Sequence, residues 1–241
     1  MRATSIIFRR ELGAYLRNPI GWVITGLILL VIGILFQSQA LGEQMLSADV
    51  LRKFFFLACG IPLIGGIALS FRLLAEERQN HSMVLLNTSP VRDTEIVLGK
   101  FFAALVFMAA ILALSVYMPL LIKVNGKVTG AQIFVGYFGL LLMGAATLAI
   151  GIFASALTKN QLIALVVGAA IVTVMCQLFP LSKRLDPPVR DVLAQLDLWW
   201  THYQASFMNG VLNLKDVIFY LATTYFFLLL SVKTLEAKRW A

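Results

Sequence analysis

The stretch Phe101–Ile122 reads FFAALVFMAAILALSVYMPLLI and contains no charged side chain. A helix of about 20 largely apolar residues is long enough to cross the hydrocarbon core of a bilayer. Lipid offers no hydrogen-bond partner to unpaired backbone groups, so such a run is expected to be helical. Similar charge-free runs lie on both sides of this one. The sequence therefore predicts an all-α, polytopic membrane protein.

Six runs of this kind occur, and we predict a transmembrane helix for each, within a single transmembrane domain that covers 1–241. The last run is short between Asp216 and Lys233, so its helix should start earlier or its flanking side chains should reach toward the membrane surface. The predicted spans are about 19–37, 54–71, 101–122, 133–157, 162–181 and 217–232.

The composition supports a membrane protein and argues against a nucleic-acid partner. Of the 241 residues, 60% are hydrophobic and 13% are charged, whereas soluble domains carry roughly 25% charged residues. The net charge is +8, but the Lys and Arg residues are spread over many short loops and form no single basic face. Such residues are typical of topology determinants beside anionic lipid.

The segments outside the spans complete the predicted topology. A larger share of the Lys and Arg residues flanks the side that holds the N-terminus, which predicts cytoplasmic N- and C-termini. Residues 1–18 place Phe8, Leu12, Tyr15 and Leu16 at helical spacing among arginines, which is typical of an amphipathic helix in the membrane interface. Residues 182–216 form the longest external loop.

The chain lacks the residues that intramembrane chemistry would need. Its only histidines, His81 and His202, fall in predicted loops on opposite sides. Cys59 and Cys176 lie inside apolar runs without the spacing of a metal site, and no phosphate-binding loop motif is present. We therefore expect no catalytic residue, no metal site and no cofactor in this chain, and no enzymatic activity of its own.

Small residues interrupt two of the predicted spans. In the fourth span, Thr147, Gly151 and Ser155 stand four apart, a spacing that allows close helix packing within the chain or, as the alternative, a dimer seam. The second span contains the run CGIPLIGG, which permits either a hinge beside a moving pathway or a packing notch. The candidate pathway or hinge residues are Gly60, Pro62, Gly65 and Gly66.

The segment Ala75–Lys100 reads AEERQNHSMVLLNTSPVRDTEIVLGK and is predicted to lie on the cytoplasmic side. Four consecutive apolar residues, Met83–Leu86, follow a polar stretch, and Pro90 stops a helix before it. A solvated connecting loop has no need for such a run, since it would expose apolar area. We expect it to be buried against lipid, this chain or a groove on a partner.

The same segment carries a resemblance to a known family. The run from Glu76-Glu77-Arg78 through Ser89-Pro90-Val91 to Glu95-Ile96-Val97-Leu98-Gly99-Lys100 resembles the signature of ABC-2 type transporter permeases, with the gliding-motility-type permeases as the closest subgroup. The tail, with Leu214–Ile218 and Arg239-Trp240, agrees. His81-Ser82 and Val84 depart from the usual pattern of the family, in which Gly-Thr and an acidic residue are common.

The resemblance implies a permease that pairs with a separate ATPase subunit, which would carry ATP and Mg. A short cytoplasmic coupling helix between the second and third spans would seat in that ATPase, and a second permease copy, or a related permease, would complete the pathway. It also implies a bacterial cytoplasmic (inner) membrane, an exporter, contact with membrane lipid and room for an accessory subunit. The coupling residues that it implies are Glu76, Glu77, Arg78, His81, Met83, Leu85 and Leu86.

Two other functions compete with the transporter permease. A non-transport membrane anchor or scaffold for a motility or secretion apparatus would also explain several spans and a partner-binding segment. An intramembrane enzyme is disfavoured, because the required pairs of catalytic residues are missing from the spans. ATPase turnover by the assembled complex would separate the transporter from the scaffold.

Overall fold

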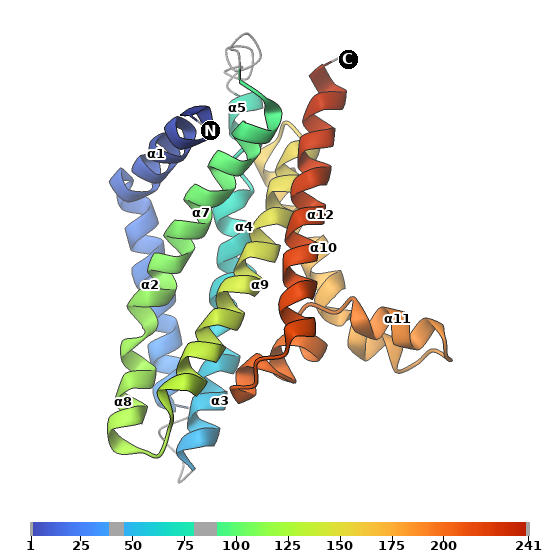
Figure 1. Cartoon of the computed structure of the whole chain (residues 1–241). Helices are drawn as coiled ribbons and strands as arrows, with labels where there is room; N and C mark the ends of the chain where they lie inside the picture. Colours follow the sequence, from blue (N-terminus) through green and yellow to red (C-terminus); the bar gives the residue numbers. More distant parts are fainter. Residues whose placement is uncertain (1, 39–45, 80–90, 240–241) are drawn as a thin grey trace.

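A computed structural model describes residues 2–38, 46–79 and 91–239 of the chain. Within these ranges the chain forms helices, turns and short loops, and no β-strand (Figure 1). The predicted all-α fold class is confirmed for this part of the chain. The first half contains α1 (Arg2–Arg17), α2 (Pro19–Phe36), α3 (Ser47–Ala58), the π-helix η2 (Ile61–Gly65), α4 (Gly66–Ser70) and α5 (Ala75–Gln79).

The second half contains the longer helices. It consists of α7 (Asp93–Ser115), α8 (Tyr117–Asn125), α9 (Gly130–Leu157), α10 (Gln161–Ser182), α11 (Val189–Gln195), the π-helix η3 (Trp200–Gln204), the 3₁₀-helix η4 (Phe207–Asn209) and α12 (Leu214–Arg239). The main helices run roughly side by side as one elongated bundle, and α11 projects sideways from it (Figure 1).

Five helices of the described chain are long and apolar enough to cross a membrane: Ser47–Gln79, Asp93–Val124, Gly130–Leu157, Gln161–Ser182 and Leu214–Lys238. A sixth span is counted if α1 and α2, which are bent by 67° between Ala3–Arg17 and Gly21–Phe36, are taken together. The first predicted span corresponds to α2.

Several helices extend beyond the apolar runs that predicted them. The second begins at Ser47, before the predicted start of its span at 54, and the third begins at Asp93. The last begins at Leu214 and continues to Arg239, as its short apolar run suggested. Backbone hydrogen bonding continues past the apolar residues at each of these ends, because polar side chains on a helix end can reach the aqueous phase.

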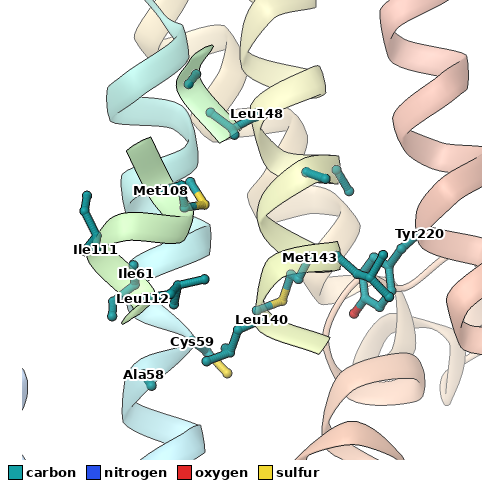
Figure 2. Close-up of a cluster of buried hydrophobic side chains, with 14 of the residues drawn as sticks. Ala58, Cys59, Ile61, Met108, Ile111, Leu112, Leu140, Met143, Leu148 and Tyr220 are labelled. Carbon is teal, nitrogen blue, oxygen red and sulfur yellow. The ribbon is translucent and has the colours of Figure 1, made fainter. Parts of the chain in front are cut away.

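The core of the bundle is built around α9, which packs against α12, α10, α4 and α7. Leu140, Met143 and Leu148 of α9 are fully buried. Figure 2 shows these side chains together with Met108 of α7, Cys59 and Ile61 of the second span, and Tyr220 of α12. The helices that carry most of the candidate site residues therefore pack against α9.

The first helix, α1, packs on α7 rather than standing alone. Ile7 and Tyr15 are buried and Leu12 packs against the core, whereas Leu16 of the predicted apolar stripe is exposed. A Cβ at Gly99 of α7 would lie only 2.9 Å from the Ile7 side chain, so this glycine permits the close approach of the two helices. The apolar stripe of α1 thus has a protein partner.

The start of α1 and the end of α12 lie at one end of the bundle, together with α5 and the connection between α9 and α10 (Figure 1). We call this the α5 end. The opposite end, which we call the α3 end, holds the start of α3, the end of α8 and the start of α12 (Figure 1). This arrangement places the Glu76–Arg78 motif and the N-terminal helix at the same end.

Candidate functional site

A buried ion cluster joins three separate elements at the α5 end. The Lys100 ammonium of α7 lies 3.1 Å from Oε1 of Glu11 in α1 and 2.9 Å from Oε1 of Glu77 in α5. The Lys100 side chain is only 2% exposed, and the two carboxylates are 15% and 14% exposed. Arg10 of α1 lies 2.7 Å and 2.8 Å from the same two carboxylate oxygens.

The charges in this cluster are balanced, with two carboxylates against one ammonium and one guanidinium. Breaking a buried pair by removing one partner costs about 3–5 kcal/mol, because it leaves an uncompensated charge in a poorly solvated place. Lys100 therefore holds α1 and α5 at fixed positions on α7, and a displacement of one element acts on the other two.

A second set of contacts ties the same end of the second span to α9. The Ser155 hydroxyl oxygen accepts hydrogen bonds from the backbone N–H groups of Leu74, at 3.0 Å, and Ala75, at 2.8 Å. Arg78 donates to the carbonyl oxygen of Ala156 near the end of α9. These bonds form where the second span leaves its α-helical path and continues into α5.

The predicted coupling residues occupy different environments. Glu77 is part of the ion cluster, Arg78 is half-buried against α9, and Glu76 is exposed. Only Glu76 of these three therefore presents a free-standing surface position. The other four, His81, Met83, Leu85 and Leu86, lie outside the described residues.

The predicted hinge residues lie at a π-helical turn. Pro62 lies inside η2, and its carbonyl oxygen accepts a hydrogen bond of 2.7 Å from the Thr147 hydroxyl of α9. A Cβ at Gly66 would overlap the Thr147 side chain, whereas a Cβ at Gly60 or Gly65 would meet nothing within 4 Å. Gly66 is thus a packing notch, while Gly60 and Gly65 each have room for an added Cβ.

The small residues of α9 all face the second span of the same chain. Thr147 contacts Pro62, a Cβ at Gly151 would overlap Ser70, and Ser155 receives the two backbone bonds described above. Packing within the chain, one of the two alternatives for this row, is confirmed. The row places the second span, the π-turn and α5 on one continuous surface of α9.

Residues 5–232 match the family model described as ABC-2 family transporter protein. The chain belongs to this family. It is therefore a permease component of an ABC transporter, a multi-pass membrane protein whose family works with an ABC ATPase and is generally not catalytic itself. A search of curated proteins found no match.

In this ABC-2 chain the α3 end carries a second polar cluster. The Asp197 carboxylate accepts hydrogen bonds from the backbone N–H groups of Phe179, Trp199, Trp200 and Thr201. Burial raises the pKa of Asp197, and the four N–H donors act in the opposite direction. The residue thereby fixes the end of α10 to η3.

A histidine completes the junction at the α3 end. His202 is buried, with Nδ1 2.7 Å from Oδ1 of Asp216 and Nε2 3.0 Å from the carbonyl oxygen of Gln195. Its ring stacks on Phe219 of α12 at 3.8 Å between centroids. His202 therefore joins α11 to the start of α12. Its environment in this ABC-2 permease is that of a packed structural residue.

Sequence reasoning on the ABC-2 chain missed Lys100 and Glu11 as members of the site. Lys100 borders a charge-free run, so the sequence indicated a lysine that sets membrane topology. Glu11 lies among the arginines of α1. The two residues are separated by 89 positions in the chain. An acidic residue inside an otherwise basic amphipathic helix was the signal available, because it needs a cationic partner if that face is buried.

Proposed function

We propose that this chain is the membrane-spanning permease of an exporter, driven by a separate ATPase subunit that carries ATP and Mg. The observation that carries the proposal is the ion cluster of Lys100, Glu11 and Glu77, together with membership in the ABC-2 family. The cluster connects the start of the 75–100 segment to both the N-terminal helix and the third span.

Force applied to the 75–100 segment has two routes into the bundle. Through Glu77 and Lys100 it reaches α1 and α7. Through the Ser155 and Arg78 bonds it reaches α9, the central helix. We propose that residues 75–100 contain the coupling helix and that the ATPase binds at its exposed positions, beginning with Glu76. We also propose that the chain belongs to the gliding-motility subtype of these permeases.

A surface at the second and fifth spans supports a second permease copy. A cavity of about 420 Å³ lies between them, lined by residues that include Ile64 and Ile67 of the second span and Val172 of α10. Thr173 and Gln177 of α10 also line it and are exposed. Polar side chains on a span favour a protein or water neighbour over hydrocarbon. We propose a homodimer across this face, with a related permease as the alternative partner.

The α5 end would face the cytoplasm of a bacterial cell, with both termini there, and the chain would lie in the cytoplasmic (inner) membrane. This orientation follows the greater share of Lys and Arg on that side. It also places Glu76 where a cytoplasmic ATPase can reach it. An accessory subunit is compatible with this arrangement.

The first test is to isolate the tagged chain gently from its native membranes and identify its partners by mass. The proposal expects a stoichiometric soluble subunit with a phosphate-binding loop, and ATP turnover that depends on the permease. A complex that lacks such a subunit, with nucleotide and crosslinker present, would overturn the transporter and favour the scaffold for a motility or secretion apparatus.

A matched pair of variants tests the coupling step itself. Glu76→Arg changes an exposed position, and we expect it to weaken ATPase association while the chain stays folded. Asp191→Arg changes an exposed position on α11 toward the α3 end and should leave association intact. Equal association for both variants would contradict the assignment of Glu76 to the ATPase contact.

A further inference from the structure

Two cavities at the α5 end share a wall. The first, of about 330 Å³, is polar and is lined by residues that include Glu11, Glu76 and Lys100. The second, of about 220 Å³, lies among α2, α4 and α7. Tyr15, Asn18 and Arg72 line both. One polar compartment thus adjoins one apolar compartment deeper in the bundle.

The polar compartment carries charge of both signs. Lys100 forms ion pairs with Glu11 and Glu77. The other charged side chains that line the polar compartment are Arg72 and Glu76. The Arg72 guanidinium carbon lies 5.6 Å from the centre of the Tyr15 ring, which orients it at the junction of the two compartments. A guanidinium binds phosphate with charge-assisted hydrogen bonds, and a carboxylate does the same for an ammonium.

The apolar compartment has the lining of a hydrocarbon site. Its wall includes Ile28 of α2, Leu69 of α4, and Phe107 and Ile111 of α7. Gly65, which also lines it, is buried, yet a Cβ placed there would meet no atom within 4 Å. Gly65 is therefore shielded from solvent, and the space beside its Cα is an unfilled part of the cavity. Real protein interiors leave few such voids unfilled.

We infer that the two adjoining cavities bind one phospholipid with a phosphate and a primary ammonium in its headgroup. In the chain without its ATPase, Arg72 takes the phosphate, Glu76 takes the ammonium, and an acyl chain enters the compartment beside Gly65. The placement of this lipid in the cytoplasmic leaflet rests on the proposed function. The binding itself does not.

The two charges in the site select among lipids. A trimethylated ammonium has the same charge as a primary ammonium but no N–H donor for Glu76. A glycerol headgroup has no cation and would leave the Glu76 carboxylate facing a phosphate. The headgroup chemistry alone is also available from a soluble compound, phosphoethanolamine, which lacks the acyl chain.

The experiment is native mass spectrometry of the full chain, delipidated in mild detergent and then given phosphatidylethanolamine, phosphatidylcholine or phosphatidylglycerol of the same acyl length. We expect one phosphatidylethanolamine per chain to remain bound at activation energies that strip the other two. An excess of soluble phosphoethanolamine should not displace it. Displacement would show that the headgroup alone binds, and equal retention of all three lipids would show annular lipid only; either result overturns the proposal.

Two variants probe the two compartments separately. Arg72→Gln removes the phosphate ligand, and Gly65→Leu fills the apolar compartment; each should reduce the retained fraction about tenfold, the effect of losing roughly 1.4 kcal/mol of binding free energy. Lys215→Gln, exposed at the α3 end, is the control and should bind normally. Unchanged binding in both variants contradicts the site. Because no ATPase is present, this result is independent of the proposed transport function.

Discussion

At the scale of single residues, Lys100 is the position that joins α1, α5 and α7 at the α5 end. Its ammonium is removed from water and receives two carboxylates from elements far apart in the chain. A side chain in this place cannot be replaced by an apolar one without leaving two acidic groups short of a cation. The same reasoning makes the length of the side chain matter, because both carboxylate oxygens lie near 3 Å from it.

We predict that Lys100→Met destabilises the chain by about 3–5 kcal/mol, the cost of breaking a buried ion pair from one side. The measurement is thermal unfolding of the purified chain in one detergent. Lys100→Arg keeps the charge and should recover part of the loss. Lys215→Met, at an exposed lysine, serves as the control; a loss as large there as at Lys100 would show that the effect is not specific to the cluster.

The sequence predicted the charged motif but not its geometry. Glu76, Glu77 and Arg78 could be recognised as a unit by their order, yet their side chains have three different surroundings. Adjacent helical positions point in different directions, about 100° apart, so a contiguous motif is divided among neighbours. Only the folded positions of α1 and α7 decide which member of the motif is buried.

At the scale of elements, the second span is the part whose shape departs most from a regular helix. The π-turn at Ile61–Gly65 contains a proline and is followed by Gly66, which fits directly against Thr147. The apolar run predicted a helix at this place, since hydropathy depends on composition, although the helix extends over Ser47–Gln79 rather than 54–71. The π-turn could not be located from composition, because it arises from one proline and from close packing on a helix distant in sequence.

A pair of adjacent glycines tests this packing. Gly66→Ala should destabilise the chain by about 1–3 kcal/mol, since the added Cβ forces the Thr147 side chain to move in a tightly packed place. Gly65→Ala should be tolerated, because its Cβ would enter open space. The measurement is thermal unfolding of both variants. Equal losses of stability would contradict the close contact of the second span with α9.

The junction between α10 and η3 gives a second prediction at this scale. Asp197→Ala removes the acceptor of four backbone N–H groups and should cost about 1–3 kcal/mol, the penalty for buried donors without partners. Asp197→Asn keeps one carbonyl oxygen and should lose less. Hydrogen exchange of the amides at 199–201 should rise in the Ala variant; unchanged exchange would mean that the carboxylate does not hold this turn.

At the scale of the whole molecule, the two ends of the bundle carry different structural features. The α5 end contains the ion cluster, Glu76 and the two adjoining cavities, whereas the α3 end contains the short helices from α11 to η4 (Figure 1). The sequence predicted six spans, and the described residues contain five helices of sufficient length and hydropathy, or six if α1 and α2 are counted together. The sequence did not predict the sideways projection of α11, because it depends on where α10 stops and on the bonds of Asp197 and His202.

Labelling from the two sides of the membrane tests this arrangement. Single cysteines at Gln79 and at Gln195, both exposed, should react with an impermeant reagent from opposite sides in a chain that carries Cys59→Ala and Cys176→Ala. The position at Gln79 should be reached only from the cytoplasm. Reaction of both positions from the same side would exclude the alternating path of the helices.

The far end of α12 has a consequence for how the chain is made. Lys238 donates hydrogen bonds to the carbonyl oxygens of Ala156 and Leu157, the last turn of α9, at 3.1 Å and 2.7 Å. These carbonyl groups have no partner within their own helix. They emerge from the ribosome long before Lys238 does. Arg78 also donates to the Ala156 carbonyl and is synthesised before α9. A nascent chain can therefore form that bond as soon as α9 is made, whereas the Lys238 bond to the Leu157 carbonyl forms only when synthesis is almost finished.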